Sequence, residues 1–251
     1  MLIILVILII AGNCASTPES QNKSPSINQE TFFQSVRDGS TDDVKKILRK
    51  GADVNTQDKK GKTALIIASQ YGRFSIVDLL IEQGADMNIQ DHNGCTALMC
   101  ALCSGNTFIA KSLIEKNVDV NIQDNRGYSA LMCASYFGMT EIAQLLIMNG
   151  AHLEAQNSDG VNSLMWASHW GQTEIVRILI DAGGNINTAD NMGATALMYA
   201  SYWGYPKIVS LLLENKVEIR AQDKKGHTAL SIDTEVGHAE IVEILKESGA
   251  N

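Results

Sequence analysis

A pattern with a period of about 33 residues runs through most of this chain. An acidic or amide residue occupies the same position in six consecutive copies: Asp58, Asp91, Asp124, Asn157, Asp190 and Asp223. A glycine recurs at the same interval: Gly39, Gly72, Gly105, Gly138, Gly171, Gly204 and Gly237. A fixed period of this length is typical of arrays in which each small unit buries its apolar surface against its neighbours. It predicts a core that extends along a row of units.

Each unit is expected to hold two short helices. In residues 58–90, the first helix is predicted over Thr63–Tyr71 and ends at Gly72, in the left-handed conformation that favours glycine. The second is predicted over Ser75–Glu82, where apolar residues recur every three or four positions. Neither helix can bury its apolar face alone, so adjacent units must stack.

The unit resembles the ankyrin repeat. The matching first-helix motifs are Thr63-Ala64-Leu65, Thr96-Ala97-Leu98, Ser129-Ala130-Leu131, Ser163-Leu164, Thr195-Ala196-Leu197 and Thr228-Ala229-Leu230. Units close with Gly-Ala-x-x-Asn, as at residues 51–55 and 84–88. The family's Thr-Pro-Leu-His motif carries Ala here in place of Pro, and Met in place of His at Met99, Met132, Met165 and Met198. We expect the methionines to fill packing gaps instead of hydrogen-bonding.

The resemblance implies an all-α solenoid of seven stacked helix-turn-helix repeats with short β-hairpin-like connecting turns. The expected repeats are residues 27–57, 58–90, 91–123, 124–156, 157–189, 190–222 and 223–251. In the last of these, Asp233 takes a slot that is alanine in the five preceding repeats. A charge in that slot is tolerable only where no further unit covers it, so we expect a C-terminal cap there.

The segment before the array, residues 1–26, has a different character. Residues 1–11 are wholly apolar but span only about half of a bilayer, which favours the core of a signal peptide over a transmembrane helix. Cys14 follows Ala11, Gly12 and Asn13 in a pattern similar to the lipobox of bacterial lipoproteins, although Asn13 departs from the usual Gly or Ala. We expect residues 1–14 to be a signal peptide with lipidation at Cys14. A signal peptide cut elsewhere, or a plain hydrophobic tail, is the alternative.

Residues 15–26 are polar and include prolines and serines, so we expect a disordered tether between the anchor and the repeats. The expected location is therefore outside the cytoplasm, periplasmic or at the cell surface, on a membrane-anchored lipoprotein. A secreted soluble protein is the alternative.

Composition and motif spacing narrow the functional classes. The formal net charge of −8 argues against a nucleic-acid surface. No catalytic triad, phosphate loop or metal-ligand spacing is present, so we expect no enzyme, cofactor or metal. We expect Cys95, Cys100, Cys103 and Cys133 to be small apolar fillers, with a redox, disulfide or metal-binding role as alternatives.

The resemblance implies a binding scaffold whose concave side carries the contacts. Aromatic residues gather near the ends of the first helices in the fourth to sixth repeats. The predicted partner-binding residues are Tyr128, Tyr136, Phe137, His169, Trp170, Tyr202 and Trp203. Half-buried packing between helices is the alternative for these rings, and we expect Trp166 and Tyr199 to lie in the core.

The expected function is a non-enzymatic protein–protein interaction module that acts as a monomer and meets the membrane only through its lipid anchor. The alternative is an exported inhibitor or protective regulator of a specific enzyme, redox-linked through Cys100 and Cys103. The sequence does not identify the partner protein.

Overall fold

The computed structural model describes residues 29–250, and within them it contains fourteen helices and no strand longer than an isolated bridge. The helices form seven consecutive pairs. These are α2 (Gln29–Asp38) with α3 (Thr41–Arg49), α4 (Ala64–Gln70) with α5 (Phe74–Glu82), α6 (Ala97–Cys103) with α7 (Thr107–Glu115), α8 (Ala130–Phe137) with α9 (Thr140–Met148), α10 (Ser163–His169) with α11 (Thr173–Asp181), α12 (Ala196–Tyr202) with α13 (Pro206–Glu214), and α14 (Ala229–Val236) with α15 (Ala239–Glu247). The expected signal peptide, Cys14 and the tether lie outside the described residues.

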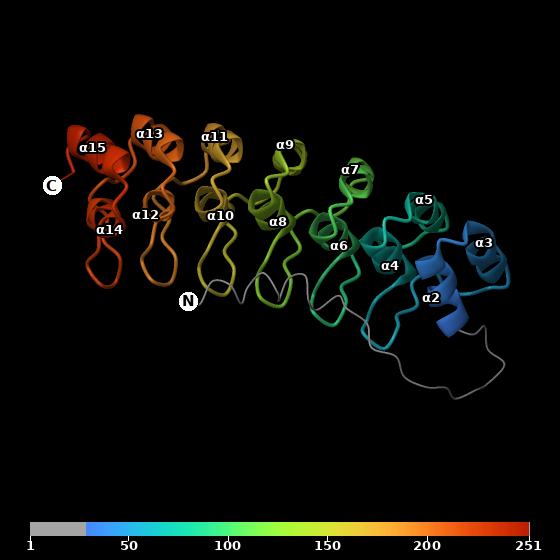
Figure 1. The fold of residues 1–251 in the computed structure, drawn as a ribbon. Coiled ribbons are helices and arrows are strands. Elements are labelled where there is room, and N and C mark those ends of the chain that lie inside the picture. Colours follow the sequence, from blue (N-terminus) through green and yellow to red (C-terminus); the bar gives the residue numbers. More distant parts are fainter. Residues whose placement is uncertain (1–28, 251) are drawn as a thin grey trace. The chain divides into compact units, whose positions relative to one another are not determined.

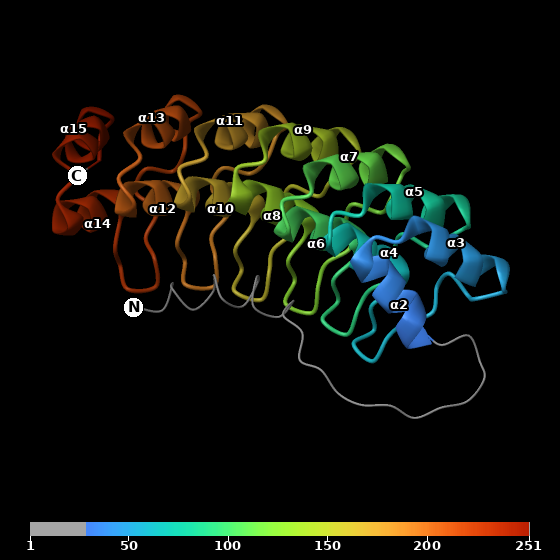
Figure 2. The same ribbon diagram turned by 45° about the vertical axis from the view of Figure 1, so that its right-hand side comes forward.

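Contacts divide the chain into two units, one up to Asn125 and one from Arg126. In the first unit, the first helices of the pairs (α2, α4, α6) pack in one layer and the second helices (α3, α5, α7) in another (Figure 1). The second unit repeats this arrangement, with α8, α10, α12 and α14 in one layer and α9, α11, α13 and α15 in the other (Figure 2). The helical stacking expected from the period is therefore confirmed within each unit.

The helix ends follow from the repeating residues. Thr63 Oγ1 accepts a hydrogen bond from the backbone N–H of Ile66 at 3.2 Å, and Asn162 Oδ1 accepts one from that of Met165 at 3.0 Å. Such side chains satisfy N–H groups that the first helical turn leaves open. Pro206 begins α13, where its missing N–H costs nothing. Most second helices are followed by a glycine with positive φ, but Asn117 and Lys216 take this conformation at φ 62° and 61°, at a cost of about 1 kcal/mol each.

The core lies between and within the pairs. The four methionines that replace the family's histidine, Met99, Met132, Met165 and Met198, are all buried. This confirms the prediction that they fill space in the core. Trp166 and Tyr199, expected in the core, are only half-buried, because both rings belong to an aromatic cluster that reaches the surface.

Each pair is joined to the next by a hairpin-like turn. Asp190 Oδ1 accepts hydrogen bonds from the backbone N–H groups of Met192 at 2.7 Å and Ala194 at 2.8 Å, which folds the turn back on itself. Neighbouring turns also bond to each other, as in the bond from Asn191 N–H to the carbonyl of Asp159 at 3.0 Å. Gly160 lies at this contact with φ 80°, and a Cβ there would come within 2.6 Å of the Asn191 nitrogen. Only glycine fits a turn stacked this closely.

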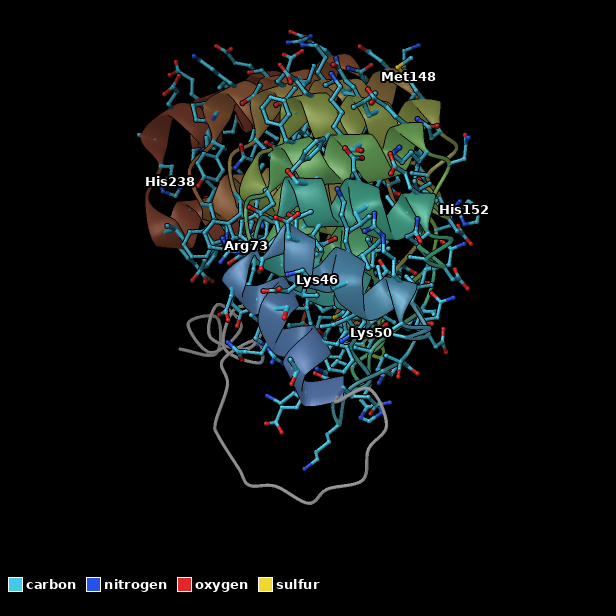
Figure 3. All side chains as sticks on the ribbon, turned by 90° about the vertical axis from the view of Figure 1, so that its right-hand side faces the viewer. Lys46, Lys50, Arg73, Met148, His152 and His238 are labelled. Carbon is cyan, nitrogen blue, oxygen red and sulfur yellow. The ribbon has the colours of Figure 1, made fainter. Side chains whose placement is uncertain are left out.

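Side chains at the start of the second helices bind back to the preceding repeat. Arg73 Nη2 and Nε donate to the carbonyl of Arg37 at 2.6 and 3.0 Å, and Asn106 Nδ2 donates to the carbonyl of Ser69 at 2.8 Å. His238 Nδ1 lies 3.1 Å from the carbonyl of Ser201 in the same way. Arg73 and His238 are both labelled in Figure 3. The carbonyls of Arg37 and Ser69 lie at helix ends, where the helix itself supplies no partner. The carbonyl of Ser201 also accepts from the backbone N–H of Gly204.

Asp233 corrects one expectation about the last repeat. It was expected to be tolerated through the lack of a covering unit, yet its side chain is completely buried. One carboxylate oxygen, Oδ1, lies 2.8 Å from Nδ1 of His238, while Oδ2 has no hydrogen-bond partner among the described residues. A carboxylate and a carbonyl both accept, so Nδ1 carries the proton that it shares between Asp233 and Ser201. Burial raises the pKa of Asp233, and the bond to His238 opposes that rise.

Candidate functional site

Nine aromatic rings of the second unit form one connected group, here called the aromatic cluster. Its members come from α8, α10 and α12, their C-terminal ends and the turn before α8. They are Tyr128, Tyr136, Phe137, Trp166, His169, Trp170, Tyr199, Tyr202 and Trp203. The period explains the grouping, because residues one period apart occupy the same place on helices that pack side by side.

Tyr136 joins the first half of the cluster. Its ring centroid lies 4.7 Å from that of Phe137, 4.9 Å from that of Trp170 and 5.6 Å from that of Trp166. All three pairs meet edge to face, the geometry in which the positive edge of one ring faces the negative face of another. Tyr128 extends the group through Trp166, with centroids 6.0 Å apart.

His169 joins the second half. Its ring centroid lies 4.9 Å from that of Trp203 and 5.0 Å from that of Trp170. Trp203 Nε1–H donates a hydrogen bond to His169 Nδ1 at 3.1 Å, so Nδ1 is an acceptor and the neutral ring carries its proton on Nε2. Burial lowers the pKa of His169 to about 4. The histidine is therefore uncharged at neutral pH.

The cluster also buries polar N–H groups. His169 Nε2, Trp166 Nε1 and Trp170 Nε1 are each inaccessible and have no hydrogen-bond partner among the residues that the structure describes. A buried donor without a partner costs about 1–3 kcal/mol. The packing of these rings is therefore less favourable than that of an apolar core of the same size.

Tyr199 connects the cluster to the turn before its helix. Its hydroxyl donates a hydrogen bond of 2.7 Å to Asp190 Oδ2, while the other carboxylate oxygen of Asp190 holds the turn together. Burial raises the pKa of Tyr199, and the hydrogen bond to Asp190 and the nearby charge of Asp159 raise it further. The phenol stays protonated and fixes the ring against the turn.

A family model described as ankyrin repeats (3 copies) matches the chain over residues 32–124, 72–157, 131–223 and 191–251. The chain belongs to the ankyrin repeat family. Ankyrin repeats generally serve as protein–protein interaction modules and are generally not enzymes. The expected fold and the general class of function follow from this membership.

This ankyrin repeat protein exposes only part of the predicted contact surface. Phe137, Tyr202 and Trp203 are exposed, by 40%, 48% and 39% respectively. Tyr136 and Trp170 are half-buried. These five residues are here called the aromatic row. The rings pack between repeats, as the packing alternative expected, and they also present an edge to solvent.

Two predicted contact residues are placed differently. Tyr128 and His169 were expected at the surface, but each is 6% exposed, so that expectation is wrong. Tyr128 packs against Trp166 and lies under the guanidinium of Arg126, 5.5 Å from the ring centroid. His169 is covered by Trp203 from the next repeat and by Trp170. His169 therefore lies beneath the aromatic row, whereas Tyr128 reaches the row only through Trp166.

Sequence reasoning left two apolar surface residues out of the predicted site. Met192, at the tip of the turn before α12, is 55% exposed, and Val236, at the end of α14, is 45% exposed. The repeat period could have identified both residues, because it places each of them at a position equivalent to one in the preceding repeat. Val236 lies one period after Trp203, and Met192 lies one period after Asp159 at the preceding tip.

Three further features of the described residues concern metal sites, the cysteines and membrane-spanning helices. No group of three or more potential metal ligands occurs between residues 29 and 250. Cys100 and Cys133 are buried, as small core residues are, and Cys95 and Cys103 are half-buried. None of the helices in this part of the chain has the length and apolar character needed to cross a bilayer.

Proposed function

We propose that this ankyrin repeat protein binds a partner protein through the aromatic row of its second unit. The observation that carries the proposal is the exposure of Phe137, Tyr202 and Trp203, three large apolar side chains on one layer of helices. Large exposed apolar residues in a group usually mark a contact site. Aromatic side chains also give much contact area for little loss of side-chain entropy, which makes them frequent hot spots.

Contacts among the rings, and with His169 beneath them, hold the side chains of the aromatic row in place. Trp203 is held by its hydrogen bond to His169, and Tyr136 is held between Phe137 and Trp170. A side chain already fixed in its bound conformation loses less entropy on binding. The unsatisfied N–H groups of Trp166, His169 and Trp170 indicate that these rings do not serve stability alone.

The double variant Phe137→Ala/Tyr202→Ala tests the surface. Neither side chain makes a hydrogen bond to a described residue, so the fold is expected to remain intact. Loss of two hot-spot rings is expected to weaken partner capture at least about tenfold. Capture is measured by cross-linking and pull-down from native membranes, with quantification of each protein recovered with the wild type.

Phe108→Ala is the matched control, because Phe108 is 82% exposed on α7, in the first unit. Its capture is expected to equal that of the wild type. Equal capture by the double variant, with unchanged circular dichroism, would reject the aromatic row as the contact surface.

We further propose that the protein is exported and tethered to a membrane by lipid on Cys14, acting as a monomer. The support is the apolar segment 1–11, the lipobox-like residues that follow it and the polar segment 15–26. A lipid anchor at the N-terminus, followed by a polar tether of this length, would leave the repeats free to bind a partner above the bilayer surface.

Cys14→Ser is expected to release the protein from the membrane fraction, because the thiol that would carry the lipid is gone. Metabolic labelling with a radioactive fatty acid, followed by fractionation and immunoblotting, measures both effects. Cys133→Ser is the control, since Cys133 is a buried free thiol in α8. Continued membrane association and labelling of the Cys14 variant would rule out the anchor.

A further inference from the structure

We propose that the occupant of the aromatic row is an extended segment of a partner protein that carries lysine or arginine side chains. This inference rests on the proposed function and specifies the chemistry of the partner. None of α8, α10, α12 and α14 contains a lysine or an arginine.

The one exposed charge on these four helices is negative. Glu235 lies near the end of α14, one period after Tyr202, and thus takes the place of that ring on the next helix of the layer. Its side chain is exposed and makes no ion pair or hydrogen bond to a residue between 29 and 250. The other acidic residue, Asp233, is buried against His238 and does not face solvent. The row of exposed rings therefore ends at an exposed carboxylate.

The two turns beside the middle of the row carry no positive charge at their tips. The two middle turns of the unit precede α10 and α12, and their tips hold Asp159 and Met192 without any basic residue. Asp159 is exposed, and its carboxylate has no partner in the described part of the chain. Its charge nevertheless acts on the cluster, since it contributes to the raised pKa of Tyr199. The basic tip residues, Arg126 and the pair Lys224 and Lys225, lie on the first and last turns.

This combination of aromatic faces and exposed carboxylates fits a cationic side chain. A guanidinium or ammonium group is attracted to the face of Trp or Tyr, and the alkyl stem of Lys or Arg covers apolar surface. Glu235 and Asp159 would each pair with a further basic group along an extended segment. Residues 126–251 contain eight lysines and arginines against fourteen acidic residues, so the field of the whole unit also draws a basic segment.

Selection of a random peptide library on the full chain tests the inference. The peptides retained are expected to be enriched in Lys and Arg, and their binding is expected to weaken as salt is raised. The double charge variant Asp159→Asn/Glu235→Gln is expected to weaken binding of the selected peptides about two- to fivefold. Glu240→Gln is the control, because Glu240 is an exposed acid on α15, in the other layer of helices.

The outcomes separate the two proposals. Selection of neutral or acidic peptides that still require Phe137 and Tyr202 would overturn the basic partner and leave the surface in place. Selection of peptides that bind the Phe137→Ala/Tyr202→Ala variant as well as the wild type would overturn both. A selection that enriches no sequence would show that the row does not take a basic segment. The same conclusion would follow if the protein formed concentration-dependent dimers that the Phe137→Ala/Tyr202→Ala variant prevented.

Discussion

Replacing Ala167 with aspartate is expected to lower the free energy of unfolding by about 3–5 kcal/mol at pH 7. Ala167 is completely buried in α10 and occupies the slot in which the last repeat carries Asp233. At that last repeat the partner of the carboxylate, His238, lies five residues further along the chain. The residue five positions after Ala167 is the amide Gln172, which has no imidazole ring. A buried carboxylate at position 167 would therefore lack the imidazole partner that Asp233 has.

Urea unfolding followed by circular dichroism measures this loss. Ala167→Ser is the control for size and polarity, and its loss is expected to be much smaller. Adding Gln172→His to Ala167→Asp reproduces the pair seen at Asp233 and His238, so we expect recovery of part of the lost stability. A fall below about 1 kcal/mol for Ala167→Asp, or no recovery on adding the histidine, would contradict this account of the pair.

Acidification is expected to destabilise the second unit through His169. The pKa of this histidine is about 4 in the folded protein, against an ordinary value of 6.5. The unfolded chain therefore binds more protons between these values, and stability falls as the pH falls through that window. The contribution is fully present above pH 6.5 and is expected to amount to about 2–3 kcal/mol. Protonation also opposes the hydrogen bond that Nδ1 accepts from Trp203.

His169→Gln isolates the effect, because glutamine does not titrate but still offers an acceptor to Trp203. Urea unfolding at several pH values between 4 and 7 is compared for the two proteins. Asp233 changes the pH dependence of stability in the opposite direction, since its raised pKa makes the ionised form unfavourable in the folded protein. This contribution is the same in both proteins. Stability curves that run parallel over the whole range would show that His169 does not titrate as described.

The sequence predicts the repeating architecture well because each repeat carries its own helix signals. In residues 58–90, the first helix was expected over Thr63–Tyr71, and the structure places α4 over Ala64–Gln70 with Thr63 and Tyr71 as its caps. The second was expected over Ser75–Glu82 and is observed as α5, Phe74–Glu82. Local signals such as the capping threonine and the terminal glycine act over a short stretch of chain, so one sequence suffices to read them.

Burial within the aromatic cluster was harder to predict because it depends on the neighbouring repeat. Tyr128 occupies the slot just before the helix cap, at the base of the turn, where Lys62 and Val161 in other repeats are buried too. His169 has the same slot as Tyr202, yet the ring of Trp203 covers it. Tyr202 and Trp203 are followed in the next repeat by Glu235 and Val236, which have no rings, and they stay exposed.

The close stacking of the turns also restricts how a chain of this kind can change in length. Gly160 lies against the backbone of Asn191 in the next turn, and the equivalent Gly127 lies against Asn157. One residue inserted into a turn would displace this contact and the bond from Asn191 to Asp159 together. Duplication or deletion of a complete unit keeps every such contact in register. Lengthening or shortening of the second unit is therefore tolerated in whole repeats and not in single residues.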